Sequence, residues 1–130
     1  MKPILCSCFA GEADEPFADC AIGELTGEWQ THYVEKSGEC GAIPDEMTST
    51  DPSSPPRAGC SVQKSTVSTD KCQLDRSFTC PTADGLGIGA WIVAFRQVAE
   101  TRLEGTGTAQ INHSTLGACR STYEITMTKL

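Results

Sequence analysis

The chain has 130 residues, a formal net charge of −7 and eight aromatic side chains, which suits one small domain with a modest apolar core. Its acidic balance excludes the nucleic-acid-binding classes, which need a basic face. No apolar run approaches the roughly 20 residues of a membrane-spanning helix, so we expect membrane contact only through a covalently attached lipid.

The first eight residues resemble the signal of a bacterial lipoprotein. Residues 5–7 occupy the three positions before Cys8, whose thiol would then accept the lipid. We interpret residues 1–8 as a truncated signal of this kind, because only residues 3–5 stand where about 7 to 15 apolar residues are usual. The alternative is a frayed terminus in which the thiols of Cys6 and Cys8 are free or paired with each other.

An acidic stretch follows the signal. Residues 9–19 contain four acidic side chains and no basic one. Such a stretch is typical of a flexible, solvated tether, here between an anchor and a domain. We expect residues 20–130 to form a single β domain with a net charge of −4.

Alternation of apolar and polar residues is the main structural pattern of the domain. It begins in residues 25–33, where one face would carry Leu25, Gly27, Trp29, Thr31 and Tyr33, and the other Glu28, Gln30 and His32. A weaker strand is expected over residues 43–49. Residues 51–59 contain three prolines and a glycine, which predicts a surface loop.

A hairpin is predicted next, with strands over residues 61–67 and 72–80 and a turn at residues 68–71. If the hairpin closes at the middle of that turn, Cys60 faces Cys80. Opposed residues of an antiparallel pair lie within disulfide reach. We therefore predict a Cys60–Cys80 disulfide.

Three further strands are expected toward the C-terminus. Residues 90–98 fit a strand or a helix face, and their β-branched content favours a strand that turns near Glu100 into a second one over residues 102–111. The last strand would cover residues 121–130. The inward positions of the final two strands would be Leu103, Gly105, Gly107, Ala109, Ile111, Tyr123, Ile125 and Met127. The inward glycines would make room for a bulky neighbour such as Trp29 or Trp91, or leave a cavity.

Six cysteines fall within the domain: Cys20, Cys40, Cys60, Cys72, Cys80 and Cys119. An even, scattered set is typical of disulfides in an oxidising compartment. No C-x-x-C pair occurs among them, so we predict no metal site, and we predict no cofactor. Apart from Cys60–Cys80, the pairing stays open. The predicted fold class is all-β: an antiparallel meander forming a small, disulfide-stapled up-and-down barrel or sandwich.

One motif carries a family resemblance. The segment Leu25-Thr26-Gly27-Glu28-Trp29 resembles the G-x-W opening strand of calycins, and especially the L-T-G-x-W of avidin-type barrels. The resemblance implies an up-and-down barrel in which Trp29 plugs one end against a basic side chain, Lys129 or Arg120. The polar and aromatic biotin contacts of avidins have no counterparts in this sequence, so biotin binding is not carried over.

The chain as a whole is similar to small, uncharacterised, cysteine-rich lipoproteins of myxobacteria. The likeness rests on the lipoprotein-type start, the acidic tether, the spaced cysteines and the threonine-rich last strand. It implies a location in the cell envelope, as an outer-membrane lipoprotein, or outside the cell.

The inward aromatic residues are the candidate ligand-binding residues, because apolar ligand pockets combine aromatic walls with few polar groups. They are Trp29, Tyr33, Trp91, Phe95 and Tyr123. Arg76 alternates with apolar residues and would be either a polar contact of the pocket or a gatekeeper on an edge strand. His32 and His113 are expected to be solvated surface residues, and no catalytic residues are predicted. The glycines of residues 85–89 indicate a hairpin or barrel corner rather than a phosphate cradle.

The sequence therefore favours a monomeric, non-enzymatic lipoprotein domain that binds a small apolar ligand or a protein partner. A first alternative is a disulfide-rich protease inhibitor or effector that presents residues 51–59 as a rigid loop. A second alternative is an enzyme that uses carboxylates such as Glu28 and Glu124 on adjacent strands.

Overall fold

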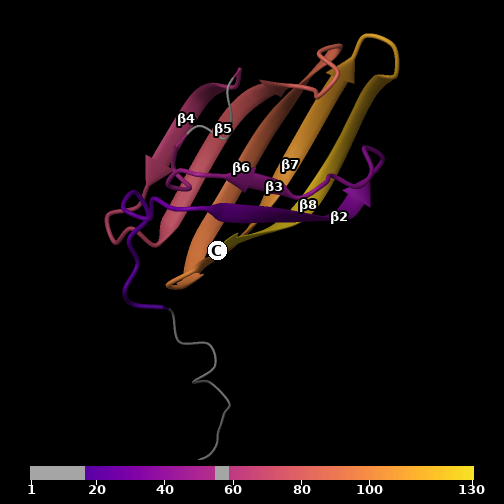
Figure 1. Ribbon diagram of the computed structural model, residues 1–130. Helices are drawn as coiled ribbons and strands as arrows, with labels where there is room; N and C mark the ends of the chain where they lie inside the picture. The colour runs from indigo at the N-terminus through magenta and orange to yellow at the C-terminus, as the bar shows by residue number, and fades with distance from the viewer. Residues whose placement is uncertain (1–16, 55–58) are drawn as a thin grey trace, which may run out of the picture.

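The computed structural model describes residues 17–54 and 59–130, which form seven antiparallel strands (Figure 1). The strands are β2 (Trp29–Gly38), β3 (Glu46–Thr48), β4 (Ser61–Val67), β5 (Gln73–Pro81), β6 (Gly87–Ala99), β7 (Arg102–His113) and β8 (Gly117–Lys129). They make one sheet in the order β3-β2-β8-β7-β6-β5-β4. Among the described residues, no helix is long and apolar enough to cross a membrane.

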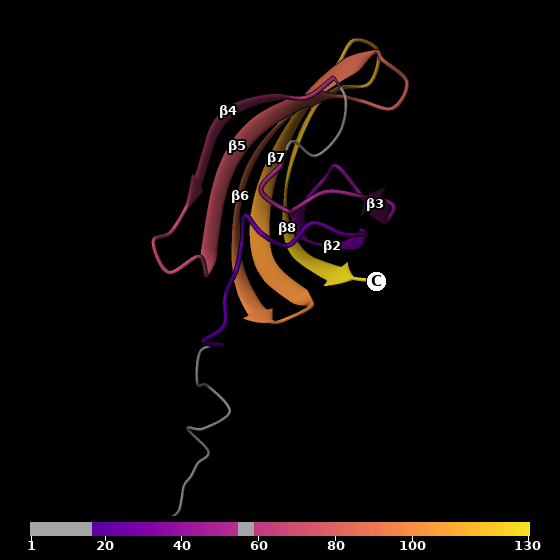
Figure 2. The ribbon, with the colours of Figure 1, turned by 60° about the vertical axis from the view of Figure 1, so that its left-hand side comes forward.

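The sheet is curled into a half-barrel, which Figure 2 shows as a trough with β2 and β3 on one side and β4 and β5 on the other. β2 pairs with β8, so the first and last long strands meet inside the sheet. β3 and β4 are its two edges and do not pair with each other. The predicted class, an all-β antiparallel fold linked by disulfides, is confirmed, and the barrel is open along one side.

Two clusters of buried side chains fill the concave side of the sheet. The first contains Ile22, Leu25, Trp29, Leu74, Leu103 and Met127. The second contains Val93, Ala109, Tyr123 and Ile125. Side-chain alternation explains both clusters, because six of the eight inward positions predicted for β7 and β8 are buried, and the other two, Gly105 and Ile111, are partly exposed. Ile92, between two inward residues of β6, is 70% exposed on the convex face.

Two glycines of β7 allow this close packing. A Cβ atom on Gly105 would overlap the backbone of β6 and lie 2.8 Å from the ring of Phe95. On Gly107, it would lie 2.8 Å from Ile125 and 2.9 Å from Val93. Neighbouring inward side chains therefore occupy the space, and neither tryptophan is among the atoms nearest to these positions.

The β4–β5 hairpin has the predicted register near its open end. Ser61 lies opposite Thr79, and the predicted Cys60–Cys80 disulfide is present. A bulge after Val62 shifts the pairing by one residue toward the turn.

The two disulfides that the sequence left open are long-range. Cys20–Cys72 joins the chain before β2 to the start of β5, and Cys40–Cys119 joins the loop after β2 to β8. The bridged cysteines are 52 and 79 residues apart in the sequence, which explains why strand alternation alone did not identify these pairs.

Several predicted boundaries are corrected. The first strand begins at Trp29 and not at residue 25, because the backbone nitrogen of Leu25 donates to Asp51 instead of joining the sheet. β8 begins at Gly117, since residues 117–120 also pair with β7. The expected surface loop is buried at its start, at Asp51 and Pro52. Residues 55–58, residues 1–8 with Cys8, and most of the tether lie outside the described residues.

Candidate ligand-binding cleft

Four aromatic rings meet on the concave face of the half-barrel: Tyr33, Phe78, Trp91 and Tyr123. We call them the aromatic group. The centroid of the Trp91 ring lies 5.8 Å from that of Tyr33, 6.4 Å from that of Phe78 and 5.6 Å from that of Tyr123. Tyr33 and Tyr123 meet edge to face at 6.2 Å. These separations are typical of interacting aromatic pairs.

The strand register explains why these rings converge. Phe78 on β5 lies directly opposite Trp91 on β6. Trp91 and Tyr123 come from strands separated by β7, which presents the small residues Gly107 and Ala109 between them. Because β7 has no large side chain at these positions, rings from its two neighbours can touch across it.

The aromatic group borders an open cleft with a volume of about 620 Å³, which we call the outer cleft. Its walls include Tyr33, Phe78 and Trp91 from the aromatic group, together with Ile43, Pro44, Glu46, Pro81 and Ile111. The volume lies within the range of about 300–1,000 Å³ that small-molecule sites usually have. All three of these rings are partly exposed.

A smaller space, the inner cavity, adjoins the outer cleft and has a volume of about 50 Å³. It shares Tyr33, Glu46, Phe78 and Trp91 with the outer cleft and extends toward Arg76. At this volume it holds about one or two water molecules and no organic ligand. The outer cleft is therefore the candidate ligand site.

Hydrogen bonds orient the two tyrosines. The Tyr33 hydroxyl donates to Glu46 Oε1 over 2.6 Å, and the Tyr123 hydroxyl donates to the carbonyl oxygen of Gly41 over 2.7 Å. Burial raises the pKa of the Tyr123 phenol, so it stays a neutral donor at physiological pH. The loop after β2 is thereby bonded to the aromatic group as well as to β8 through the Cys40–Cys119 disulfide.

Arg76 lines the inner cavity together with the loop after β3. Its Nη1 atom donates to the carbonyl oxygens of Pro52, over 2.6 Å, and Ser54, over 2.5 Å. Its guanidinium lies 5.2 Å from the centroid of the Phe78 ring. Burial lowers the pKa of Arg76, and the nearby Asp51 carboxylate acts in the opposite direction. Arg76 Nε is buried and has no hydrogen-bond partner among the described residues.

These contacts decide between the two predicted roles of Arg76. β5 lies between β4 and β6, so Arg76 is not on an edge strand and the gatekeeper interpretation is wrong. Arg76 instead lines the inner cavity and holds residues 52–54 against the sheet. The described part of the predicted inhibitor loop, residues 51–54, is thus held against the sheet by Arg76.

The structure distributes the five predicted ligand-binding residues over different environments. Tyr33 and Trp91 line both spaces, and Phe95 lines the inner cavity. Trp29 and Tyr123 are fully buried and do not belong to the lining of either space. Sequence reasoning missed the wall residues Phe78, Ile43, Pro44, Glu46 and Ile111. Phe78 carried a usable signal, since it alternates with Arg76 toward the concave face.

Trp29 is fully buried in the first core cluster. It donates from Nε1 to the carbonyl oxygen of Leu25 over 2.8 Å and lies opposite Lys129 in the sheet. Of the two basic residues that the calycin resemblance implies for Trp29, Lys129 is therefore its neighbour. Arg120 lies near the other end of β8, opposite Gln110.

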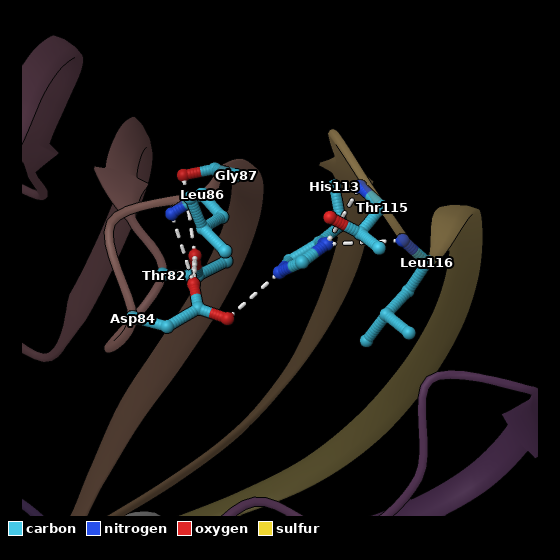
Figure 3. Close-up of polar contacts among 7 residues, drawn as sticks. All are labelled: Thr82, Asp84, Leu86, Gly87, His113, Thr115 and Leu116. Atoms are coloured by element: carbon cyan, nitrogen blue, oxygen red, sulfur yellow. Dashed lines mark hydrogen bonds and ion pairs between the residues drawn. The ribbon is translucent and has the colours of Figure 1, made fainter.

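The two histidines differ from each other. His32 is exposed, as expected, and its Nδ1 lies 2.7 Å from Asp45. The side chain of His113 is only 10% exposed, so its predicted solvation is wrong. Figure 3 shows its ring between the β5–β6 and β7–β8 turns, with Nε2 2.8 Å from Asp84 and Nδ1 accepting from the backbone nitrogens of Thr115 and Leu116, each over 3.1 Å.

This geometry gives His113 a structural role. Accepting two backbone N–H groups requires an unprotonated Nδ1, so the proton is on Nε2 and is donated to Asp84. The hydrogen bond from His113, followed by that from the Thr82 hydroxyl, holds the pKa of Asp84 well below its ordinary range. Both ring nitrogens are thus used to join the two turns.

No group of three or more histidine, cysteine, aspartate or glutamate side chains that could hold a metal ion occurs within residues 17–54 and 59–130. Comparison of the chain with protein-family models, with curated proteins and with solved structures gave no significant match.

Proposed function

We propose that this protein is a non-enzymatic binding protein that holds a small, largely apolar molecule in the outer cleft. The observation that carries the proposal is the cleft itself, with a volume of about 620 Å³ and walls that include Tyr33, Phe78 and Trp91. Clefts of this size with aromatic walls and few polar groups are the usual form of small-molecule sites.

The rigidity of the walls supports this proposal. The Cys60–Cys80 disulfide fixes one wall, because Cys80 lines the cleft. On the other side, the Cys40–Cys119 disulfide and the Tyr123–Gly41 hydrogen bond hold the loop that leads to Ile43. A site that is ordered before binding loses less conformational entropy when the ligand arrives.

The proposed location is the cell envelope or the extracellular space. Three disulfides in one small domain are consistent with an oxidising compartment. Lipidation at Cys8, with residues 9–19 as the tether, would make the protein an outer-membrane lipoprotein. Metabolic labelling with a radioactive fatty acid, and its loss in Cys8→Ala, would test this part.

Binding is tested with the neutral fluorescent dye Nile red. We expect saturable binding to the wild type and a loss of about tenfold in affinity in Trp91→Ala, since Trp91 supplies a large part of the aromatic wall. Ile92→Ala is the matched control, because Ile92 is the next residue of β6 and lies exposed on the convex face.

A second variant keeps the test valid if Trp91→Ala fails to fold. Gly89 lines the cleft, and a Cβ atom there would lie 3.4 Å from Trp91 Nε1 and 3.5 Å from Ile111, which are ordinary contacts. The Cβ atom of Gly89→Val is therefore accommodated, and its two further methyl carbons should fill part of the cleft and weaken dye binding. Undiminished binding in both Trp91→Ala and Gly89→Val would overturn the proposal.

A further inference from the structure

Three aromatic residues lie where the inner cavity and the outer cleft meet. Tyr33 on β2, Phe78 on β5 and Trp91 on β6 line both spaces. On β5, Arg76 stands two positions before Phe78 and lines the inner cavity, and Cys80 stands two positions after it and lines the outer cleft. The three rings therefore form the wall of the outer cleft toward the inner cavity.

The rings of Phe78 and Trp91 are nearly parallel in this wall. Their planes differ by 10°, and their centroids lie 6.4 Å apart. Both rings are partly exposed, and the Arg76 guanidinium lies over Phe78 at 5.2 Å from its centroid, on the side of the inner cavity. A flat molecule that stacks on Phe78 from the cleft is therefore nearly parallel to the Trp91 ring as well.

The indole N–H of Trp91 is an available hydrogen-bond donor in the same wall. Within residues 17–54 and 59–130 it has no acceptor, whereas Trp29 Nε1 donates to the carbonyl oxygen of Leu25. In these same residues, Arg76 Nε is the only buried side-chain polar atom without a partner. Solvent therefore reaches the unpaired Trp91 nitrogen.

Gly89 leaves room for a ligand beside this donor. A Cβ atom on Gly89 would lie 3.4 Å from Trp91 Nε1 and 3.5 Å from Ile111. Gly89 lies opposite Cys80 on β5 and Ile111 on β7, and all three line the outer cleft. Because the N–H lies in the plane of the indole, a flat ligand stacked on Phe78 can meet it with an acceptor at its edge.

A ligand without an acceptor would displace solvent from the Trp91 N–H and leave that group unpaired, which lowers affinity. We propose that the ligand of the outer cleft is a planar aromatic molecule with a hydrogen-bond acceptor, such as a carbonyl oxygen, attached to its ring. The ring stacks on Phe78, and the acceptor receives the Trp91 N–H beside Gly89. This inference rests on the proposed binding function and specifies the class of ligand.

The test compares three probes of similar size: acetophenone, α-methylstyrene and cyclohexyl methyl ketone. α-Methylstyrene has a methylene group in place of the carbonyl oxygen of acetophenone and so lacks the acceptor. Cyclohexyl methyl ketone keeps the carbonyl group on a ring that is not planar. We expect acetophenone to bind about fivefold more tightly than either of the others, because only acetophenone both stacks and accepts the hydrogen bond.

Each probe is titrated into the full ¹⁵N-labelled chain and followed by NMR. The chain has two tryptophans, so it gives two indole N–H signals. Acetophenone should move the Trp91 indole proton downfield, and α-methylstyrene should not. The Trp29 signal is the internal reference, since its N–H is already bonded to Leu25.

Trp91→Phe keeps a ring in the wall and removes the donor, and it also assigns the Trp91 signal. It should weaken acetophenone binding about fivefold and leave α-methylstyrene within about twofold of the wild type. Phe78→Leu keeps an apolar contact without the flat ring, so it should abolish the preference for acetophenone over cyclohexyl methyl ketone. Ile92→Ala, exposed on the convex face of β6, is the matched control and should bind all three probes as the wild type does.

The outcomes separate this inference from the function on which it rests. If α-methylstyrene or cyclohexyl methyl ketone binds the wild type as tightly as acetophenone, or if the Trp91 signal does not move, the inference is overturned, whether or not Trp91→Phe folds. Saturable Nile red binding that Gly89→Val weakens would then leave the apolar-ligand function standing. If neither Nile red nor any of the three probes binds, both proposals are wrong.

Discussion

The carboxylate of Asp51 accepts a hydrogen bond of 2.6 Å from the backbone nitrogen of Leu25, across 26 residues of sequence. The same oxygen accepts from the nitrogen of Gly23 over 3.0 Å, and the second oxygen accepts from the nitrogen and hydroxyl of Ser53. Asp51 thereby joins the loop after β3 to the segment before β2. It supplies acceptors for backbone N–H groups that no strand pairs, including that of the buried residue Leu25.

Asp51 should make stability depend on pH. Burial raises its pKa, but the hydrogen bonds from Ser53, Leu25 and Gly23 lower it by more, so the net pKa lies below the ordinary value. The folded state therefore favours the carboxylate. Its contribution is complete above the unfolded pKa of about 3.9 and is lost as the pH falls through the lower folded pKa.

We expect Asp51→Asn to lower the free energy of unfolding at pH 7 by about 1–3 kcal/mol, because the amide cannot accept all of these hydrogen bonds. The variant should also lose less stability than the wild type below about pH 4. Urea unfolding at several pH values measures both effects. Asp75→Asn, on the exposed face of β5, is the control, and an equal loss in the two variants would contradict the assigned role.

Arg76 is expected to stabilise the loop after β3, which lines the inner cavity. Arg76→Met leaves the carbonyl oxygens of Pro52 and Ser54 without this donor, and should cost about 1–3 kcal/mol in the free energy of unfolding. Arg96→Met, on an exposed position of β6, should cost less than about 0.5 kcal/mol. If Arg76→Met were more stable than the wild type, the desolvation penalty of burying the guanidinium would exceed the stabilisation from its hydrogen bonds.

How much the sequence revealed depended on the range of the interaction. The inward positions of β7 and β8 and the Cys60–Cys80 disulfide followed from alternation and hairpin geometry, which are local. Cys20–Cys72 and Cys40–Cys119, with separations of 52 and 79 residues, depend on how the whole sheet curls. No local pattern encodes that curvature.

The residues of the candidate cleft were also predictable only where a local pattern identified them. Tyr33 and Trp91 were predicted because they alternate toward the concave side, and both line the cleft. Phe78 required the β5–β6 register, which places it opposite Trp91. Glu46 lies in β3, which has three residues and is too short to show alternation.

The glycines of the concave face should differ sharply in their tolerance of a methyl group. Gly105→Ala places a Cβ atom against the backbone of β6 and 2.8 Å from the Phe95 ring, so we expect a loss of about 2–4 kcal/mol in the free energy of unfolding. Gly89→Ala is the matched control, because its Cβ atom meets nothing closer than 3.4 Å. It should cost less than about 1 kcal/mol. Urea unfolding measures both, and similar losses would contradict the packing described for β7.

His113 is expected to hold the two turns at the end of the half-barrel. His113→Ala removes the acceptor for the nitrogens of Thr115 and Leu116, so their amide hydrogens should exchange with solvent about tenfold faster. It also removes the main cause of the lowered pKa of Asp84, which should rise toward the ordinary value of about 3.9. Amide exchange and a carboxyl titration followed by NMR measure the two effects.

His32→Ala separates this network from a general effect of losing a histidine. His32 is exposed on β2 and contacts Asp45, far along the chain from Asp84. The control should therefore leave both the Asp84 titration and the exchange at Thr115 and Leu116 unchanged. If His113→Ala changed the exchange rates without moving the Asp84 titration, the Nδ1 contacts would stand but the Nε2 bond to Asp84 would not. A shift in the Asp84 titration alone would retain the bond to Asp84 and exclude Nδ1 as the acceptor that orders the β7–β8 turn.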